Sequence, residues 1–260
     1  MNRTCIDRYA GPKIKGIDVS HHNGNVNWGD VAQDGTSRFA IIRTGDVAAR
    51  LGPEDQKFTR NWAGAKSAGV RRGSYQYFRT AYGGIAQADR LLRQLDGAGG
   101  SLDSDLPPAI DIEEAGQVTQ GDLPLGMAQV LDETGLWLDR VESELGVTPM
   151  IYTGQYWHWK ASQQGLGQEF ARYPLWTPSY GTSCCKMPVT PTGGPGPWSK
   201  WTIWQYSGHG AAAGVRGDVD LNYFRGTEVD LARFVASSRK RGALLDSLTP
   251  FASAFRAWLR

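Results

Sequence analysis

Two carboxylates with the spacing of a catalytic pair stand in residues 109–114, which read Ala-Ile-Asp-Ile-Glu-Glu. If this segment is a β-strand, Asp111 and Glu113 point to the same face, about 7 Å apart along the strand. Acidic residues are poor strand formers and are costly to bury, so two of them on one face require an explanation. Most enzymes that hydrolyse glycosidic bonds use such a pair of carboxyl groups as their catalytic residues. An edge strand with one solvated face is the alternative interpretation of this segment alone.

Strand-like and helical patterns alternate along the chain and would position these carboxylates. Eight short runs favour β-strands, at residues 16–20, 39–45, 72–79, 108–113, 150–154, 175–180, 202–207 and 218–224. Apolar residues at spacings of three and four, each set followed by a glycine, predict helices over residues 54–68, 85–95 and 125–145. These helices fall between the earlier strands. After Leu175 the strands are separated by turns and Gly/Pro loops.

This alternation indicates a parallel sheet with crossover connections, and 260 residues suit one large barrel. We therefore predict an α/β fold, a single modified TIM-like β/α barrel whose helices are missing after the later strands. The active residues of such barrels lie at the carboxyl ends of the strands. Asp18 from the first strand, Asp111 and Glu113 from the fourth, and Asp220 from the eighth are then expected at one mouth.

Three regions are predicted along the chain: an N-terminal extension over residues 1–13, the barrel over residues 14–235, and a tail over residues 236–260. Apolar residues in the tail follow a helical period and have basic neighbours, which predicts a basic amphipathic C-terminal helix. A helix that docks on the barrel or pairs with itself is the favoured interpretation. Contact with a membrane surface or a partner protein is the sharper alternative.

The overall composition excludes several classes of protein. Hydrophobic residues make up 40% of the chain and charged residues 21%, which is typical of a globular rather than a disordered protein. The 28 basic and 26 acidic residues nearly cancel, unlike the balance of a nucleic-acid-binding protein. No apolar stretch is long enough to span a membrane, and residues 1–15 lack the apolar core of a secretory signal, so the route of export or release is open.

Cysteine and histidine usage predicts neither a metal site nor a cofactor. Cys5, Cys184 and Cys185 are too few for a disulfide scaffold and lack the spacing of a zinc site. His21 and His22 are adjacent and would point apart in an extended chain, and the other two histidines are isolated in the sequence. A catalytic site built on carboxylates is therefore expected to work without a metal.

Four segments taken together point to a known family. They are residues 16–28 (GIDVSHHNGNVNW), 109–114 (AIDIEE), 149–157 (PMIYTGQYW) and 201–224 (WTIWQYSGHGAAAGVRGDVDLNYF). In these motifs and in their order, the chain resembles the glycoside hydrolase family 25 lysozymes, also called Chalaropsis-type or Cellosyl-type N-acetylmuramidases. Each motif alone is weak, but four motifs in family order are highly specific.

The resemblance implies hydrolysis of the β-1,4 bond between N-acetylmuramic acid and N-acetylglucosamine in bacterial peptidoglycan, with retention of configuration. It implies that Glu113 is the general acid/base. Asp111 would stay charged and orient the substrate's 2-acetamido group as the nucleophile, and direct attack by Asp111 is the competing possibility. Asp18 would tune pKa values and position water, while Asp220 would hydrogen-bond the sugar or support the pair.

Aromatic and amide side chains near the strand ends are candidates for the substrate groove. They are Tyr77, Tyr152, Trp176, Trp204 and Gln205. Aromatic rings stack on sugar faces, and simple packing is at least as good an explanation for each ring.

Two departures from the family pattern are expected in the groove wall. Gln76 stands where the family usually has His, and Pro178 stands where it usually has Ala. They leave room for a glycosidase that acts on another N-acetylhexosamine polymer. A non-catalytic peptidoglycan-binding barrel is the alternative from a different class, and the four acidic residues argue against it. The expected place of action is the bacterial cell wall, on its extracellular or periplasmic side.

Overall fold

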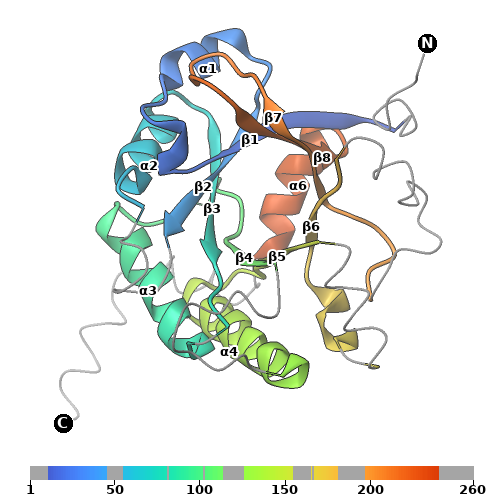
Figure 1. The fold of residues 1–260 in the computed structure, drawn as a ribbon. Coiled ribbons are helices and arrows are strands. Elements are labelled where there is room, and N and C mark those ends of the chain that lie inside the picture. The colour runs from blue at the N-terminus through green and yellow to red at the C-terminus, as the bar shows by residue number, and fades with distance from the viewer. Residues whose placement is uncertain are drawn as a thin grey trace, which may run out of the picture.

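The computed structural model describes residues 11–45, 55–80, 82–101, 103–113, 126–154, 165, 167–180 and 197–239. Within these ranges, eight strands form one closed barrel in the order β1 to β8 (Figure 1). The strands are β1 (Lys13–Val19), β2 (Phe39–Gly45), β3 (Arg71–Tyr77), β4 (Ala109–Ile112), β5 (Met150–Thr153), β6 (Leu175–Pro178), β7 (Ile203–Gly210) and β8 (Val219–Arg225). The barrel confirms the predicted fold class, and each of the eight predicted strands is present.

The sheet is parallel from β1 to β7, but β8 runs antiparallel to both of its neighbours. Parallel neighbours need a long crossover connection, and the short connection at residues 211–218 allows only a hairpin. The parallel pairing predicted from the alternation of the earlier strands and helices therefore does not extend to β8. Because β8 is reversed, its first residues lie at the mouth of the barrel, and Asp220 pairs in register with Asp18 of β1.

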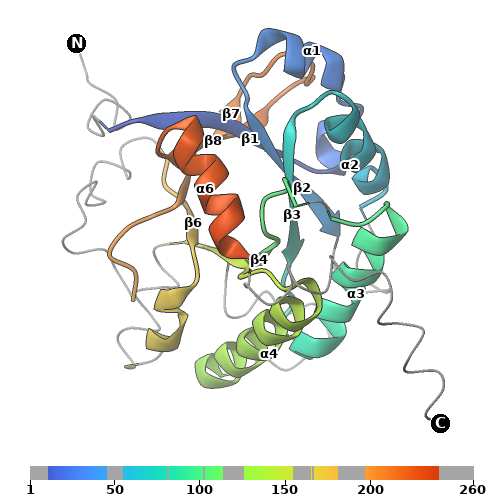
Figure 2. The same cartoon turned by 180° about the vertical axis from the view of Figure 1, so that it is seen from behind.

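Most of the helices cover the outside of the barrel between the earlier strands, and one α-helix follows the last strand (Figures 1 and 2). They are α1 (Trp28–Asp34), α2 (Phe58–Ser67), α3 (Gly84–Gly97), α4 (Met127–Leu145) and α6 (Glu228–Ser238), with the 3-10 helices η2 (His21–Asn23) and η3 (Gln168–Arg172). The predicted helices correspond to α2, α3 and α4. The short α1 was missed; the Asn27 side chain caps it by accepting from the N–H groups of Gly29 and Asp30.

The strand alternation separates an inner from an outer core. Ile110 and Ile112 pack outward against the helices, whereas Ala109 packs inside the barrel. Near the barrel's amino end the interior is filled by Phe39, and a Cβ on Gly16 would lie 2.4 Å from its ring. Glycine at position 16 is therefore required by the packing of the barrel interior.

The helix α6 closes the amino end of the barrel. Its buried Leu231 and Val235 pack against a cluster formed largely by residues that begin the parallel strands, including Phe39 and Met150. Figure 2, which views the molecule from behind, shows α6 lying against the barrel. The Thr227 side chain caps this helix by accepting from an N–H group of its first turn. The carboxyl ends of the parallel strands are thus left to form the mouth.

The folded barrel extends beyond the predicted boundary at residue 235. α6 continues to the buried Ser238, whose carbonyl accepts from the N–H of Thr148 at 2.6 Å. Arg239 forms an ion pair with Asp103 at 2.8 Å. The predicted amphipathic helix of the tail, from residue 240 onward, lies outside the described residues, as do all three cysteines. Within the described ranges, no helix has both the length and the apolar character needed to cross a membrane.

Candidate active site

Asp18 is held at the mouth by hydrogen bonds with neighbouring side chains. It is buried, and its Oδ2 accepts hydrogen bonds from Gln205 Nε2 at 2.9 Å and Asn222 Nδ2 at 2.7 Å. The Asp220 side chain forms a further hydrogen bond with it. Burial raises the pKa of Asp18 well above its ordinary value of 3.8, and the negative charge of Asp220 raises it further. The pair is therefore suited to share a proton.

Asp111 and Glu113 come from the end of β4. Asp111 is buried and 4% exposed, whereas Glu113 follows the last residue of the strand and is exposed. Burial raises the pKa of Asp111, the charge of Glu113 raises it further, and Arg43 opposes both effects. Among the described residues, Asp111 Oδ1 has no hydrogen-bond partner. Burial thus favours a protonated Asp111 in the unliganded protein, which differs from the expectation that it stays charged.

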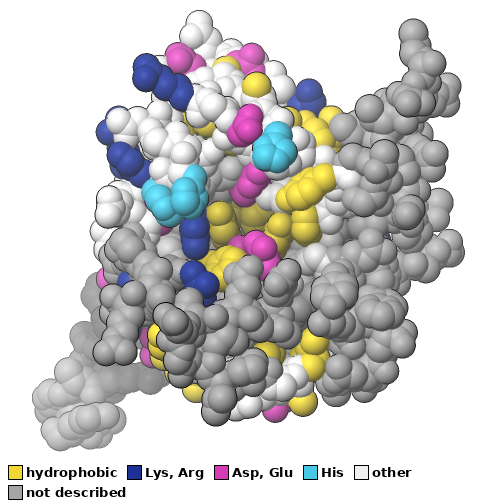
Figure 3. All heavy atoms as spheres, in the orientation of Figure 1, with side chains coloured by type: hydrophobic (Ala, Val, Ile, Leu, Met, Phe, Trp, Pro, Cys, Tyr) yellow, Lys and Arg dark blue, Asp and Glu magenta, His cyan; other side chains and the backbone are white. Residues whose placement is uncertain are grey.

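The structure brings the four predicted acidic residues together. Burial raises the pKa of the Tyr152 hydroxyl, and the charges of Asp111, Glu113 and Asp18 add to this effect. Asp220 joins them through its bond to Asp18. Figure 3 shows a hollow on one face of the molecule, with acidic, basic and histidine side chains gathered around hydrophobic ones.

Gln205 connects the floor of the site. It is buried, and while its amide nitrogen donates to Asp18, its Oε1 accepts from the hydroxyls of Tyr152, at 2.9 Å, and Tyr180. Both polar atoms of this side chain therefore bond within the protein. Gln205 was predicted to bind substrate, but in the unliganded protein it positions Asp18 and two tyrosines.

Trp176 and Trp204 were both predicted in the groove, and their positions differ. Trp176 faces the barrel interior, is 1% exposed, and donates through Nε1 to Asn222 Oδ1 at 2.8 Å. It lies edge-on to Tyr152 with ring centroids 4.6 Å apart, so it supports the floor. Trp204 precedes the inward-facing Gln205 and therefore faces outward, where it packs on Trp201. The assignment of Trp204 to the groove is corrected.

Tyr77 lies at the rim, where the sequence placed it. Burial raises the pKa of its hydroxyl, and the charges of Glu113 and Asp111 raise it further. The guanidinium carbons of Arg43 and Arg79 lie 5.6 and 4.7 Å from the centroid of its ring. Neither arginine was singled out from the sequence. Arg43 lies near the end of β2, two residues after the inward-facing Ile41, so strand alternation could have placed it on the inner face but not given it a role.

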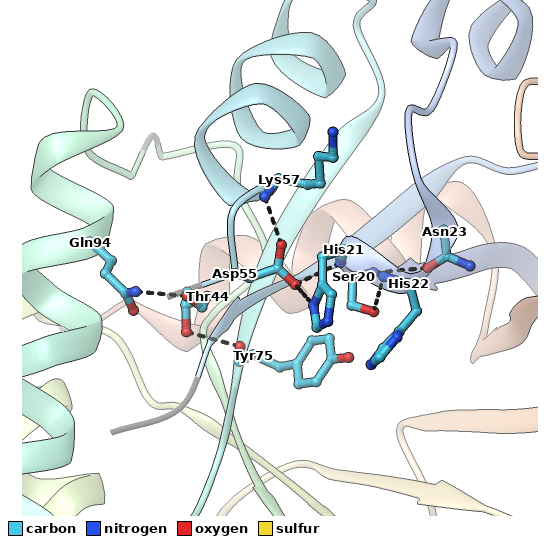
Figure 4. A network of polar contacts seen from close by, with 9 residues as sticks. All are labelled: Ser20, His21, His22, Asn23, Thr44, Asp55, Lys57, Tyr75 and Gln94. Carbon is cyan, nitrogen blue, oxygen red and sulfur yellow. Dashed lines mark hydrogen bonds and ion pairs between the residues drawn. The ribbon is translucent and has the colours of Figure 1, made fainter. Parts of the chain in front are cut away.

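The loop after β1 is fixed beside the mouth by Asp55 (Figure 4). Asp55 Oδ2 accepts from the His21 backbone N–H at 2.7 Å and lies 3.0 Å from its Nδ1, while Oδ1 accepts from the backbone of Lys57. The rings of His21 and His22 lie 3.9 Å apart. Among residues of described position, no group of three or more His, Cys, Asp or Glu side chains could hold a metal ion.

Comparison with known proteins places this barrel in a family. Residues 17–215 match the family model described as glycosyl hydrolases family 25. The chain belongs to glycosyl hydrolase family 25. Lysozyme M1 of Streptomyces globisporus is 34% identical over 235 residues, which cover 86% of this chain and 74% of that protein.

Two solved structures support the same placement of this family 25 glycosidase. A bacterial lysozyme from Streptomyces coelicolor matches with a TM-score of 0.71 and 29% identity, over 86% of this chain and 98% of that chain. A family GH25 lysozyme from Aspergillus fumigatus matches with a TM-score of 0.70 and 26% identity, over 86% and 100%.

The two departures from the family motifs fall on different faces of the barrel. Gln76 is fully buried and faces outward, where its Oε1 accepts from Trp137 Nε1 of α4 at 2.7 Å. Its expected place in the groove wall is therefore wrong, because it alternates with the inward-facing Tyr75 and Tyr77. Pro178 ends β6 in register with Gln205, so it stays at the mouth of this glycosidase.

Proposed function

We propose that this family 25 glycosidase is a muramidase that cleaves the β-1,4 bond between N-acetylmuramic acid and N-acetylglucosamine of bacterial peptidoglycan, with retention. The lysozyme names of its relatives support this substrate. The observation that carries the proposal is the contrast on β4 between a buried Asp111 and the exposed Glu113 two residues later. Such a contrast suits two carboxyl groups with different tasks.

Glu113 acts as the general acid in the proposed mechanism. Its position at the exposed end of β4 lets it donate a proton to the glycosidic oxygen as the bond breaks. The substrate's own 2-acetamido oxygen attacks the anomeric carbon from the opposite face and forms an oxazolinium ion. Glu113 then removes a proton from the water that opens this ring. The product keeps the anomeric configuration of the substrate because the anomeric carbon is attacked twice.

Asp111 accepts the acetamido N–H in this scheme. Its buried Oδ1 lacks a partner among the described residues, and a substrate N–H would satisfy it. Positive charge develops on the acetamido group as the ring closes, and this charge favours the ionised form of Asp111 against the effect of burial. Gln205 and Asn222 hold Asp18, and Asp220 is bonded to Asp18, so this pair keeps negative charge behind the reacting centre while it shares one proton.

The proposed mechanism is tested by Glu113→Gln and Asp111→Asn, with Glu169→Gln of η3 as the matched surface control. Clearing of a peptidoglycan suspension should fall by about 10²–10⁴-fold in the Glu113 variant, because the proton donor is lost. The control should clear like the wild type. If wild type and the Glu113 variant bind peptidoglycan but neither clears it, the non-catalytic binding barrel is correct.

We further propose that the enzyme acts at the bacterial cell wall, on its extracellular or periplasmic side. Its substrate lies there, and the lysozyme names of its relatives support this location. A contact between the predicted tail helix and a membrane or a partner protein remains a separate proposal.

A further inference from the structure

We propose that Arg79 and Arg43 form a subsite for a substrate carboxylate at the rim of the mouth. The inference rests on the proposed function and names the feature of the glycan that this side of the mouth recognises. The ligand chemistry is a carboxylate borne by the muramic acid unit, either on its lactyl group or on the peptide attached to it. Arg43, Arg79 and the Tyr77 ring over which both guanidinium groups lie are called the basic rim below.

The acidic mouth creates the need for such a subsite. Four carboxyl groups gather there, and a glycan that carries its own carboxylate beside the scissile bond is repelled by those of them that are ionised. A polymer of N-acetylglucosamine carries no such charge. An enzyme that prefers the muramic acid polymer must therefore supply positive charge near Glu113 and Asp111.

The basic rim supplies this charge at the right place. Arg43 lies near the end of β2 and Arg79 follows β3, so both stand at the carboxyl ends of neighbouring strands. Both guanidinium groups lie over the ring of Tyr77, within 5.6 Å of its centroid. The charges of Glu113 and Asp111 add to the effect of burial in raising the pKa of the hydroxyl of this tyrosine. A carboxylate bound by the arginines would thus lie beside the catalytic pair.

Arg79 is held in place by a buried amide. The fully buried Gln87 of α3 accepts from the Arg79 N–H at 2.9 Å and donates to the Arg79 carbonyl at 3.0 Å. Its Nε2 also donates to the carbonyl of Tyr82 at 2.8 Å. This bonding fixes the backbone of the loop after β3 and leaves the partly exposed Arg79 side chain at the rim. Guanidinium groups bind carboxylates with two parallel hydrogen bonds when they are held in this way.

The alternative role for these arginines is only to adjust the pKa values of the catalytic carboxyl groups, since the charge of Arg43 lowers the pKa of Asp111. The two roles differ in what they predict for substrates without carboxylates. A change in the pKa of Asp111 affects the turnover of every substrate equally. Recognition of a carboxylate affects only the substrates that carry one, and it acts mainly on binding.

The test compares four glycan preparations: peptide-free strands with a lactyl carboxylate, strands that keep their peptides, and each of these after its carboxylates are converted to amides. Fragment binding is measured by calorimetry and turnover by release of reducing ends. For wild type, amidation should weaken binding by about tenfold or more in at least one pair, because a charge-assisted bidentate contact is lost. The pair that responds identifies the lactyl or the peptide source.

Arg79→Gln should bind the native and amidated forms of that pair equally. Arg172→Gln is the control, because Arg172 also lies over a tyrosine ring, at 4.2 Å from the centroid, but precedes β6 at the opposite end of the barrel. The control should keep the wild-type preference. Equal wild-type binding of native and amidated glycans overturns the proposal, as does an equal loss for both forms in Arg79→Gln. Preferential binding without any bond cleavage would keep the subsite and reject the proposed function.

Discussion

At the scale of single residues, the site depends on side chains that never need to touch substrate. Asn222 links two of them, since its Nδ2 donates to Asp18 and its Oδ1 accepts from Trp176 Nε1. Gln205 links Asp18 to Tyr152 in the same way. These amides fix the orientation of a buried carboxyl group and of the aromatic floor beneath the substrate.

Asn222→Leu should therefore affect both stability and activity. The change leaves the Trp176 N–H and part of Asp18 without partners in a buried place, which costs about 1–3 kcal/mol for each unsatisfied group. Urea unfolding measures the loss of stability. Asn222→Asp keeps an acceptor for Trp176 but brings a third acid to the pair, so it should raise the pH at which Asp18 ionises. An unchanged pH–activity profile in Asn222→Asp would argue against a positioning role.

The raised pKa of Asp18 predicts how stability changes with pH. A carboxyl group whose folded pKa is raised binds its proton more tightly in the folded state, so it stabilises the fold below the ordinary value of 3.8. This contribution is lost as the pH rises from 3.8 through the pKa of Asp18 in the folded protein. Each tenfold difference in proton affinity between the folded and unfolded states corresponds to about 1.4 kcal/mol. Asp18→Asn should remove it, which flattens the fall in unfolding free energy as the pH rises above 3.8. A parallel fall in both proteins would contradict the prediction.

At the scale of elements, strand alternation predicted much of the site. It placed the two acidic side chains of residues 109–114 on one face of the strand, and the structure puts Ile110 and Ile112 on the other face, in the outer core. Trp204 and Gln205 are consecutive residues of β7, so the same rule puts them on opposite faces, although both were predicted in the groove as side chains near a strand end. Arg43 satisfied the rule, but a lone arginine in an apolar strand carries no chemical signal by itself.

Other elements depended on features that local patterns do not encode. The reversal of β8 follows from the short connection at residues 211–218, which allows only a hairpin, and the alternation within the strand itself does not encode its direction. α1 has only seven residues, too few for a clear helical period. α6 closes the amino end of the barrel through long-range contacts with Ile14, Phe39 and Met150. Its role is visible only when these residues meet in the fold.

Gly16→Ala tests the packing of the barrel interior. The new Cβ would lie 2.4 Å from the ring of Phe39, which is fully buried, so either the ring or the strand must move. We expect a loss of about 1–3 kcal/mol in unfolding free energy. Gly135→Ala of α4 is the control, because a Cβ there meets nothing within 4 Å. It should stabilise the protein by about 0.5–1 kcal/mol, since alanine is the better helix former.

At the scale of the whole molecule, the barrel has one closed and one catalytic end. α6 covers the amino end, and the carboxylates gather at the carboxyl ends of the parallel strands. The chain that leaves α6 is tied to the barrel by Arg239 and Asp103. The described barrel structure therefore continues to residue 239, past the predicted boundary at residue 235.

Two truncations test this boundary. Ending the chain after Arg239 should preserve the melting temperature and the activity on soluble glycan fragments. Ending it after Val235 removes the last residues of α6, including the buried Ser238 and the bond from Thr148 N–H to its carbonyl, so the melting temperature should fall. Identical melting of the two truncated proteins would show that residues 236–239 contribute nothing to the fold.

The proposed muramidase mechanism is tested most directly by mass spectrometry of the ends released from peptidoglycan by wild type and Glu113→Gln in ¹⁸O-labelled water. We expect reducing N-acetylmuramic acid ends that carry one ¹⁸O for wild type, and loss of these products in Glu113→Gln, whose fold should stay intact. Reducing N-acetylglucosamine ends, or equal release by both proteins, would contradict the assignment of the bond or of the proton donor.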